Sequence, residues 1–197
     1  CVAGANDAMT PAGAISALEH LENYQIVIGQ LEIPQEVTIA AFKKAQDFGA
    51  ITILNPAPFA SISPDLIAVS DWIIPNESEF AGMHPQGLGP TSDENILELS
   101  ATLKARFVVT LGEKGAAFTT RDGEIRRVAA PQVNAIDTTG AGDAFVGAFA
   151  VGLAANLIDE KAIALGCACA SESVTRRGTQ SSYPTPAQAQ EILRSIN

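Results

Sequence analysis

The chain has 197 residues, and 12 Lys plus Arg against 22 Asp plus Glu give a formal net charge of −10 at pH 7. Such a balance repels the phosphates of nucleic acids and of anionic membranes, so we expect neither as a main partner. Apolar residues at 47% and charged residues at 17% are typical of a globular protein, and the length suffices for one sizeable core. We therefore expect a single domain over residues 1–197.

The N-terminus and the cysteines bear on the compartment. The chain opens CVAGANDAMT, without the basic and apolar stretches of a signal peptide, and its longest apolar run, at 144–155, is too short to span a membrane. Three thiols, of Cys1, Cys167 and Cys169, do not make a disulfide framework. These features predict a cytoplasmic protein.

Strand-like and helix-like segments alternate along the chain. Apolar β-branched runs predict strands, and helical runs with flanking caps such as Thr10-Pro11 and Gly49 predict helices. In chain order we expect a helix at 10–21, a strand covered on both faces at 24–33, a helix at 34–48, strands at 50–54 and 71–74, a helix at 92–103, a strand at 106–111, a hairpin at 116–120 and 124–129, and helices at 140–154, 159–173 and 186–195. This alternation predicts an α/β fold with a parallel sheet.

The segment DTTGAGD at 137–143 carries the clearest chemical signal. Its two glycines let the backbone approach a ligand closely, and the amides at a helix N-terminus favour an anion. A carboxylate at Asp143 would repel a merely trapped anion. It is suited instead to accept a proton from a hydroxyl while the amides stabilise the group that is transferred. The alternative is that Asp143 only satisfies first-turn amides.

Around this segment the sequence resembles the PfkB, or ribokinase-like, family of carbohydrate kinases. The stretch DTTGAGDAF at 137–145 closely matches the C-terminal signature of that family. Further similar segments follow in the family's order: GQLEIP at 29–34, LNPAP at 54–58, PNESE at 75–79, VTLG at 109–112 and RGTQ at 177–180. The resemblance implies a three-layer α/β/α fold and ATP-dependent phosphorylation of a sugar. Within the family, the 29–34 and 54–58 segments resemble kinases that act on the 5-hydroxyl of D-ribose more than kinases that act on fructose or a nucleoside.

The resemblance also assigns roles to matching residues. Asp143 would be the catalytic base and would contact the sugar, while the amides of Gly140, Ala141 and Gly142 would bind the transferring phosphoryl group. Glu32 would also contact the sugar, although a solvated acid at a strand end is the alternative. ATP would be bound by Asn76, Thr110, Gly112, Gly115, Gly142 and Cys167. The residues alone also allow a plain turn at 110–115 and a structural, buried thiol at Cys167.

Two metal ions are implied by the same resemblance. Glu79 would lie near Mg²⁺, since the family has an N-x-x-E pattern there, although a first-turn helix acid is the structural alternative. A monovalent cation, K⁺, would bind beside the anion hole through oxygens of Asp137, Thr139, Ser173, Arg176, Gly178 and Ser182.

Residues 2–6 resemble the middle of a family member. The resemblance therefore implies that the N-terminal strands, a sugar-binding Gly-Gly turn and a β-sheet lid fall outside this sequence. It further implies that activity depends on that portion and that the complete protein is a homodimer. The alternative function is a nucleotide- or sugar-binding fragment without turnover.

Overall fold

A computed structural model describes residues 4–196, so Cys1 lies outside the described residues. Backbone contacts divide the chain into two units, one of Cys1–Val109 with Thr119–Ile125 and the other of Thr110–Phe118 with Arg126–Asn197. The single domain expected from the sequence stays a prediction.

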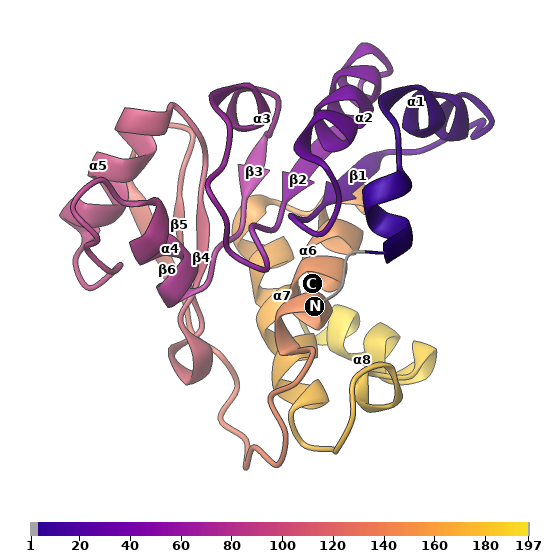
Figure 1. Cartoon of the computed structure of the whole chain (residues 1–197). Helices are drawn as coiled ribbons and strands as arrows, with labels where there is room; N and C mark the ends of the chain where they lie inside the picture. The colour runs from indigo at the N-terminus through magenta and orange to yellow at the C-terminus, as the bar shows by residue number, and fades with distance from the viewer. Residues whose placement is uncertain (1–3, 197) are drawn as a thin grey trace. The chain divides into compact units, whose positions relative to one another are not determined.

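The first unit contains a parallel sheet, as the alternating pattern predicts. Its strands are β1 (Ile26–Gly29), β2 (Ile51–Leu54) and β3 (Trp72–Ile73), which pair in the order β1-β2-β3 (Figure 1). Ile73 continues the parallel pairing through a bridge to Phe107.

Strand β1 departs from its expected burial on both faces. Gly29 faces α2 (Gln35–Asp47), where an added Cβ would lie 2.5 Å from the Thr38 side chain. Because successive residues of a strand point to opposite faces, Ile28 points away from α2, and it is 44% exposed. The expectation that this apolar run is covered on both faces is wrong at Ile28.

Several helices of the first unit begin at residues whose side chains cap them, whereas α2 follows Pro34, which makes no side-chain cap. Thr10 accepts a hydrogen bond from the Gly13 amide at 3.2 Å, and Ser92 accepts one from Asn95 at 3.3 Å. The elements are η1 (Gly4–Ala8), α1 (Pro11–Glu19), α2, α3 (Pro64–Ala68), α4 (Glu77–Met83) and α5 (Asp93–Leu103). The sequence analysis did not predict η1, α3 and α4, since one to two turns carry little periodic pattern.

The expected hairpin is present in a second three-stranded sheet, whose strands are ordered β4-β5-β6. These are β4 (Val108–Thr110), β5 (Ala116–Thr119) and β6 (Ile125–Val128). Gly123 takes the expected positive φ of 82°, and the turn is closed by the Thr120 amide, which donates to the Glu124 carbonyl at 2.9 Å.

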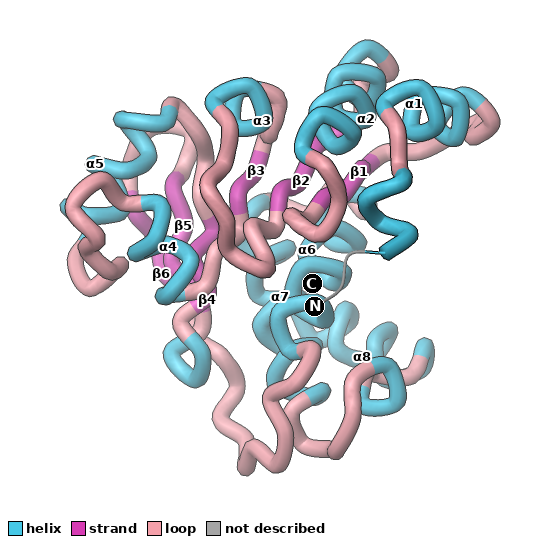
Figure 2. Tube along the Cα trace, in the orientation of Figure 1, coloured by secondary structure: helices cyan, strands magenta, loops and turns pink. Residues whose placement is uncertain are grey.

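Three helices dominate the second unit (Figure 2): α6 (Ala141–Ala154), α7 (Asp159–Ser173) and α8 (Pro186–Ile196). Their bounds agree with the expected helices within one residue. Helices α6 and α7 pack closely because Gly152 and Gly166 lack side chains; an added Cβ would lie 2.8 Å from Ala162 Cα and 2.9 Å from the Phe145 ring, respectively. The short helices η2 (Gly112–Lys114) and η3 (Gln180–Ser182) complete this unit.

Candidate active site

The turn that leads into α6 has the geometry expected for binding an anion. Gly140 is the N-cap residue with φ of 79°, a conformation that favours glycine. The Ala141 amide donates to the Thr138 carbonyl at 3.2 Å. An α-helix leaves its first four amides without partners inside the helix, so this end presents a positive dipole to a ligand, and the Ala141 amide would exchange its bond to Thr138 for the ligand on binding. Asp143 lies in the same first turn and is exposed.

Asp137 joins this turn to the loop that follows α7. Its carboxylate accepts hydrogen bonds from the amides of Thr139 and Gly178, both at 3.0 Å. Hydrogen bonds from the Thr139 side chain and from these two amides lower the pKa of Asp137 to about 2. The carboxylate is therefore ionised at neutral pH, and the structure brings Asp137, Thr139 and Gly178 together as expected.

The remaining expected cation ligands lie at the end of α7 and just after it. Ser173 is buried, and its hydroxyl donates to the Ala170 carbonyl at 2.8 Å. Ser182 is fully buried, and its carbonyl accepts from Nη2 of Arg176 at 2.9 Å. A carboxylate with neighbouring carbonyls suits a hard cation, but a cation at Ser182 would share that carbonyl with a guanidinium. Between residues 4 and 196 no three His, Cys, Asp or Glu side chains form a metal-binding group.

The loop expected to border ATP is shaped by two glycines. Gly112 (φ 57°) begins η2 one residue after β4 has ended, and Gly115 (φ 91°) returns the chain to β5. An added Cβ on Gly115 would overlap the Val128 carbonyl of β6, so this position requires glycine for packing as well. The Leu111 amide donates to the Gly115 carbonyl at 2.8 Å and closes the loop, which Thr110 precedes.

A cavity of about 360 Å³ opens beside Asp143 within the second unit. Its walls come from α6, α7 and α8 and include Gly147, Val151, Leu165, Cys169 and Leu193. Cys169, rather than Cys167, is among its lining residues. Cys167 is buried inside α7, and burial raises the pKa of its thiol to about 12.

Asn76 and Glu79 form a capping box at the start of α4. The Glu79 amide donates to Oδ1 of Asn76 at 2.9 Å, and the Asn76 amide donates to Oε2 of Glu79 at 2.8 Å. Burial raises the pKa of Glu79, whereas the bond from the Asn76 amide lowers it. The N-x-x-E spacing thus has a structural reason in addition to any role with Mg²⁺. Glu32, the expected sugar ligand, is exposed in a bend after β1 of the same unit.

The roles of two side chains of the second unit were not found from the sequence. An added Cβ on Gly140 would lie 3.0 Å from the Tyr183 hydroxyl oxygen, so Tyr183 packs against the turn. Burial raises the pKa of Tyr183, and the negative charge of Asp143 raises it further. The Arg176 side chain was also missed, because only its backbone entered the expectation. No local pattern links either residue to Gly140; both lie over thirty residues along the chain.

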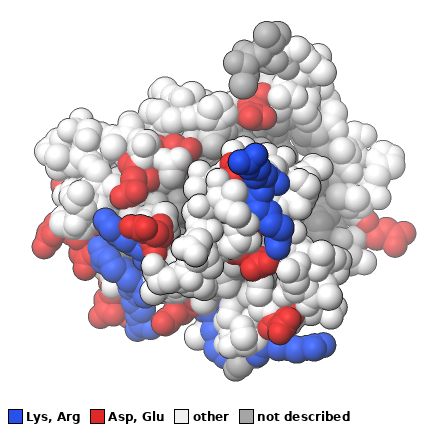
Figure 3. Space-filling model, turned by 90° about the horizontal axis from the view of Figure 1, so that it is seen from below, with Lys and Arg blue, Asp and Glu red and all other residues white. Residues whose placement is uncertain are grey.

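Acidic and basic side chains do not separate into broad regions on the face shown in Figure 3. On the face in Figure 3, Lys and Arg lie in small groups beside Asp and Glu. Arg126 and Glu160 form an exposed ion pair, with Nη1 and Oε2 3.7 Å apart. Among the helices described, none is both long and apolar enough to cross a membrane.

The sequence pattern that defines the pfkB family of carbohydrate kinases matches residues 2–186. The chain belongs to this family. It is 36% identical over 197 residues to a ribokinase of Staphylococcus aureus (strain COL), a match that covers 96% of this chain and 63% of the relative. It is also 36% identical over 201 residues to a deoxyribokinase of Salmonella typhi, across 100% of this chain and 64% of the relative.

A solved structure supports the same relationship. The structure of Arabidopsis thaliana ribokinase complexed with ribose and ATP has a TM-score of 0.83 and 29% identity; the match covers 91% of this chain and 59% of that one. The predicted ribokinase-like α/β fold is thereby confirmed. The chain thus spans less than two thirds of the length of the two curated relatives, 63% and 64%.

Proposed function

We propose that this chain is the nucleotide-binding and catalytic part of an ATP-dependent sugar kinase. The observation that carries the proposal is the Gly140 turn at the N-terminus of α6, with the Asp143 carboxylate in the first turn. Its support is membership of the pfkB family of carbohydrate kinases.

In the proposed reaction, Asp143 accepts the proton of a sugar hydroxyl, and the hydroxyl oxygen attacks the γ-phosphorus of ATP. The bond from that phosphorus to the β,γ-bridging oxygen breaks, and ADP leaves with the bond's electron pair. The amides of Gly140, Ala141 and Gly142 bind the oxygens of the transferring group, where they stabilise negative charge. Asn76, Thr110, Gly112 and Gly115 complete the proposed nucleotide site; Cys167 belongs to the same proposal, although its side chain is buried in α7.

Two metal ions belong to the proposal. Mg²⁺, when bound, would neutralise phosphate charge, and we assign Glu79 to its surroundings. We assign K⁺ to the oxygens around Asp137. This ionised carboxylate already accepts hydrogen bonds from the amides of Thr139 and Gly178, so a cation bound to it would help to order the turn before α6. This cation set also includes Thr139, Ser173, Arg176, Gly178 and Ser182.

The proposed acceptor is the 5-hydroxyl of D-ribose, with Glu32 as a sugar ligand. A second candidate is 2-deoxy-D-ribose, because the deoxyribokinase of Salmonella typhi is as similar in sequence as the ribokinase of Staphylococcus aureus. We further propose that turnover needs the part of such relatives that this chain does not match, and that the complete protein is a homodimer.

A phosphoryl-transfer assay over several sugars tests the proposal. The 197-residue chain, alone and fused to the unmatched part of the Staphylococcus aureus ribokinase, is incubated with Mg-ATP and ribose, deoxyribose, fructose or a nucleoside. We expect a 5-phosphorylated pentose from the fused form. A fructose or nucleoside product would replace the proposed acceptor, and ligand binding without product in either form would favour a non-catalytic fragment.

Calorimetric titration with Mg-ATP, with and without K⁺, separates nucleotide binding from turnover. We expect saturable binding that is tighter with K⁺, since ordering of the turn lowers the entropy lost on binding. Binding that is identical with Na⁺, K⁺ and a bulky organic cation would contradict the assignment of K⁺.

A further inference from the structure

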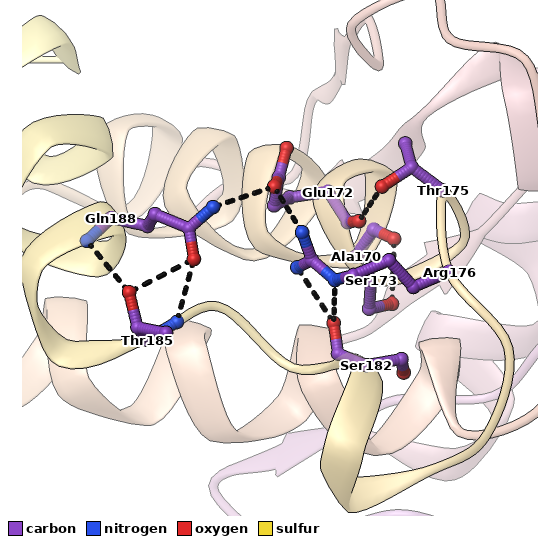
Figure 4. Close-up of polar contacts among 8 residues, drawn as sticks. All are labelled: Ala170, Glu172, Ser173, Thr175, Arg176, Ser182, Thr185 and Gln188. Carbon is purple, nitrogen blue, oxygen red and sulfur yellow. Dashed lines mark hydrogen bonds and ion pairs between the residues drawn. The ribbon is translucent and has the colours of Figure 1, made fainter.

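The Arg176 guanidinium binds a single backbone carbonyl with two of its nitrogens. Nη2 and Nε donate to the Ser182 carbonyl at 2.9 and 3.3 Å (Figure 4). The planar, rigid fork of arginine gives such a contact a defined direction, which the flexible ammonium of lysine does not. Ser182, at the end of η3, is therefore held from the segment that directly follows α7.

Glu172, in the last turn of α7, holds the guanidinium in place. Its Oε1 accepts from Nη1 of Arg176 at 2.8 Å and from Nε2 of Gln188 at 3.0 Å. Gln188 is itself fixed at the start of α8, where its Oε1 accepts from the Thr185 amide at 3.0 Å in a capping box. The guanidinium thus has a fixed position relative to both α7 and α8.

The segment between these helices contacts the proposed phosphate-binding turn at two places. At its beginning, the Gly178 amide binds the Asp137 carboxylate at 3.0 Å. At its end, Tyr183 follows Ser182 directly and packs against Gly140. Arg176 therefore holds the segment immediately beside the residue that contacts the N-cap of α6.

We propose that Arg176, oriented by Glu172, is a positioning residue for the turn at 138–142. It fixes the Ser182 carbonyl, and through this the Tyr183 ring and the Gly178 amide, so that Gly140 and the amides after it keep one arrangement. The role in catalysis rests on the proposed function, namely that these amides bind the transferring phosphoryl group. The structural coupling does not.

Three variants test this. Arg176→Gln removes the fork and the charge, Arg176→Lys keeps the charge but not the fork, and Arg194→Gln removes a charge from the exposed last turn of α8 as a control. Amide hydrogen exchange is followed by NMR in the 197-residue chain without nucleotide. The probes are the amides of Thr139, Ala141 and Gly178, each hydrogen-bonded in the structure.

In Arg176→Gln we expect exchange at these probes to accelerate about tenfold or more, the factor expected from losing a hydrogen bond to a charged group. Arg176→Lys should show a smaller acceleration and Arg194→Gln none. Amides in the middle of α6 and α7 should exchange as in the parent chain. Unchanged exchange at the probes in both Arg176 variants, or an equal acceleration throughout the unit, would overturn the positioning role.

Steady-state kinetics supply the second readout, measured in whichever form, the chain alone or the fused form, transfers phosphate to the sugar. We expect kcat of Arg176→Gln to fall about tenfold with little change in KM for the sugar, and Arg176→Lys to recover part of it. An unchanged kcat alongside faster exchange would confine the coupling to structure and overturn its catalytic part. If no form transfers phosphate, the proposed function fails, while the exchange data still decide the coupling.

Discussion

The carboxylate of Asp137 accepts a hydrogen bond from the amide of Gly178 at 3.0 Å, although 41 positions separate the two residues. The bond joins the loop before α6 to the loop after α7. The Ile136 and Asp137 amides, which donate to the Val174 carbonyl at 2.7 and 3.2 Å, support the same connection. The turn that we assign to phosphate binding is therefore held by residues distant in sequence.

This connection predicts a specific dependence of stability on pH. The pKa of Asp137 is about 2 in the folded chain against an ordinary 3.8, so its ionised form stabilises the fold. That contribution is complete at pH values well above 3.8 and is lost as the pH falls to about 2. Urea unfolding of the parent chain and Asp137→Asn should show a stability difference that is constant above about pH 5 and shrinks toward pH 2. A difference that does not vary with pH would contradict the assigned hydrogen bonds.

Alanine at Gly140 and at Gly142 should have opposite effects on stability. At Gly140 the positive φ and the nearby Tyr183 hydroxyl both oppose a Cβ, which should cost about 1–2 kcal/mol or more. At Gly142 the backbone is helical and an added Cβ meets no atom within 4 Å, so alanine should stabilise the chain by up to about 1 kcal/mol. Thermal unfolding of the two variants checks this; equal effects would contradict the described turn.

The capping box at α4 predicts that variants of Asn76 and Glu79 can separate an effect on stability from an effect on the Mg²⁺ requirement. Asn76→Ala should lower the free energy of unfolding by about 1 kcal/mol, because the Glu79 amide loses its acceptor. Burial raises the Glu79 pKa, so the folded chain binds this proton more tightly than the unfolded chain, and ionisation at neutral pH costs stability. Glu79→Gln keeps an acceptor oxygen and should be at least as stable at pH 7, with the difference vanishing in acid.

If Glu79 also acts near Mg²⁺, Glu79→Gln should require a higher Mg²⁺ concentration for half-maximal turnover, and Asn76→Ala should change that concentration less. A Glu79→Gln variant with an unchanged Mg²⁺ requirement would leave the capping box as the reason for the carboxylate.

The close packing of α6 on α7 predicts a third pair of contrasting variants. Alanine at Gly166 would place a Cβ 2.9 Å from the Phe145 ring, and such overpacking costs about 1–3 kcal/mol. Alanine at Gly147, in the middle of α6, meets no atom within 4 Å and should be neutral or stabilising. The free energies of unfolding from urea titrations decide the matter, and a Gly166→Ala variant as stable as the parent would contradict this packing.

Where the sequence carries strong periodic patterns and caps, it was sufficient to predict the structure. Helix α7 begins at Asp159 and ends at Ser173 as expected, and the Gly123 turn of the hairpin has its expected conformation. Such features depend on neighbouring residues, so local rules apply. The α6 N-terminus belongs here as well, because two glycines in DTTGAGD mark it.

Features that depend on distant contacts were not predictable. The sequence pattern of Ile28 is that of a buried strand residue, and its exposure follows only from the position of α2 on the opposite face of β1. The sequence places Tyr183 in a polar turn, and its contact with Gly140 depends on the fold. The N-x-x-E spacing at Asn76 is different, because a capping box is a local pattern: the sequence analysis kept a first-turn helix acid as the alternative for Glu79, and α4 confirms that structural role.

The central claim is that Asp143 is the base for phosphoryl transfer, and one comparison tests it most directly. The kcat of Asp143→Asn is measured with Mg-ATP and ribose in the form that turns over, beside Asp159→Asn, which removes a first-turn acid from α7. We expect kcat to fall about 10²-fold or more in Asp143→Asn, with Mg-ATP binding by calorimetry retained, and to change little in Asp159→Asn. A near-parental kcat in Asp143→Asn would contradict the claim.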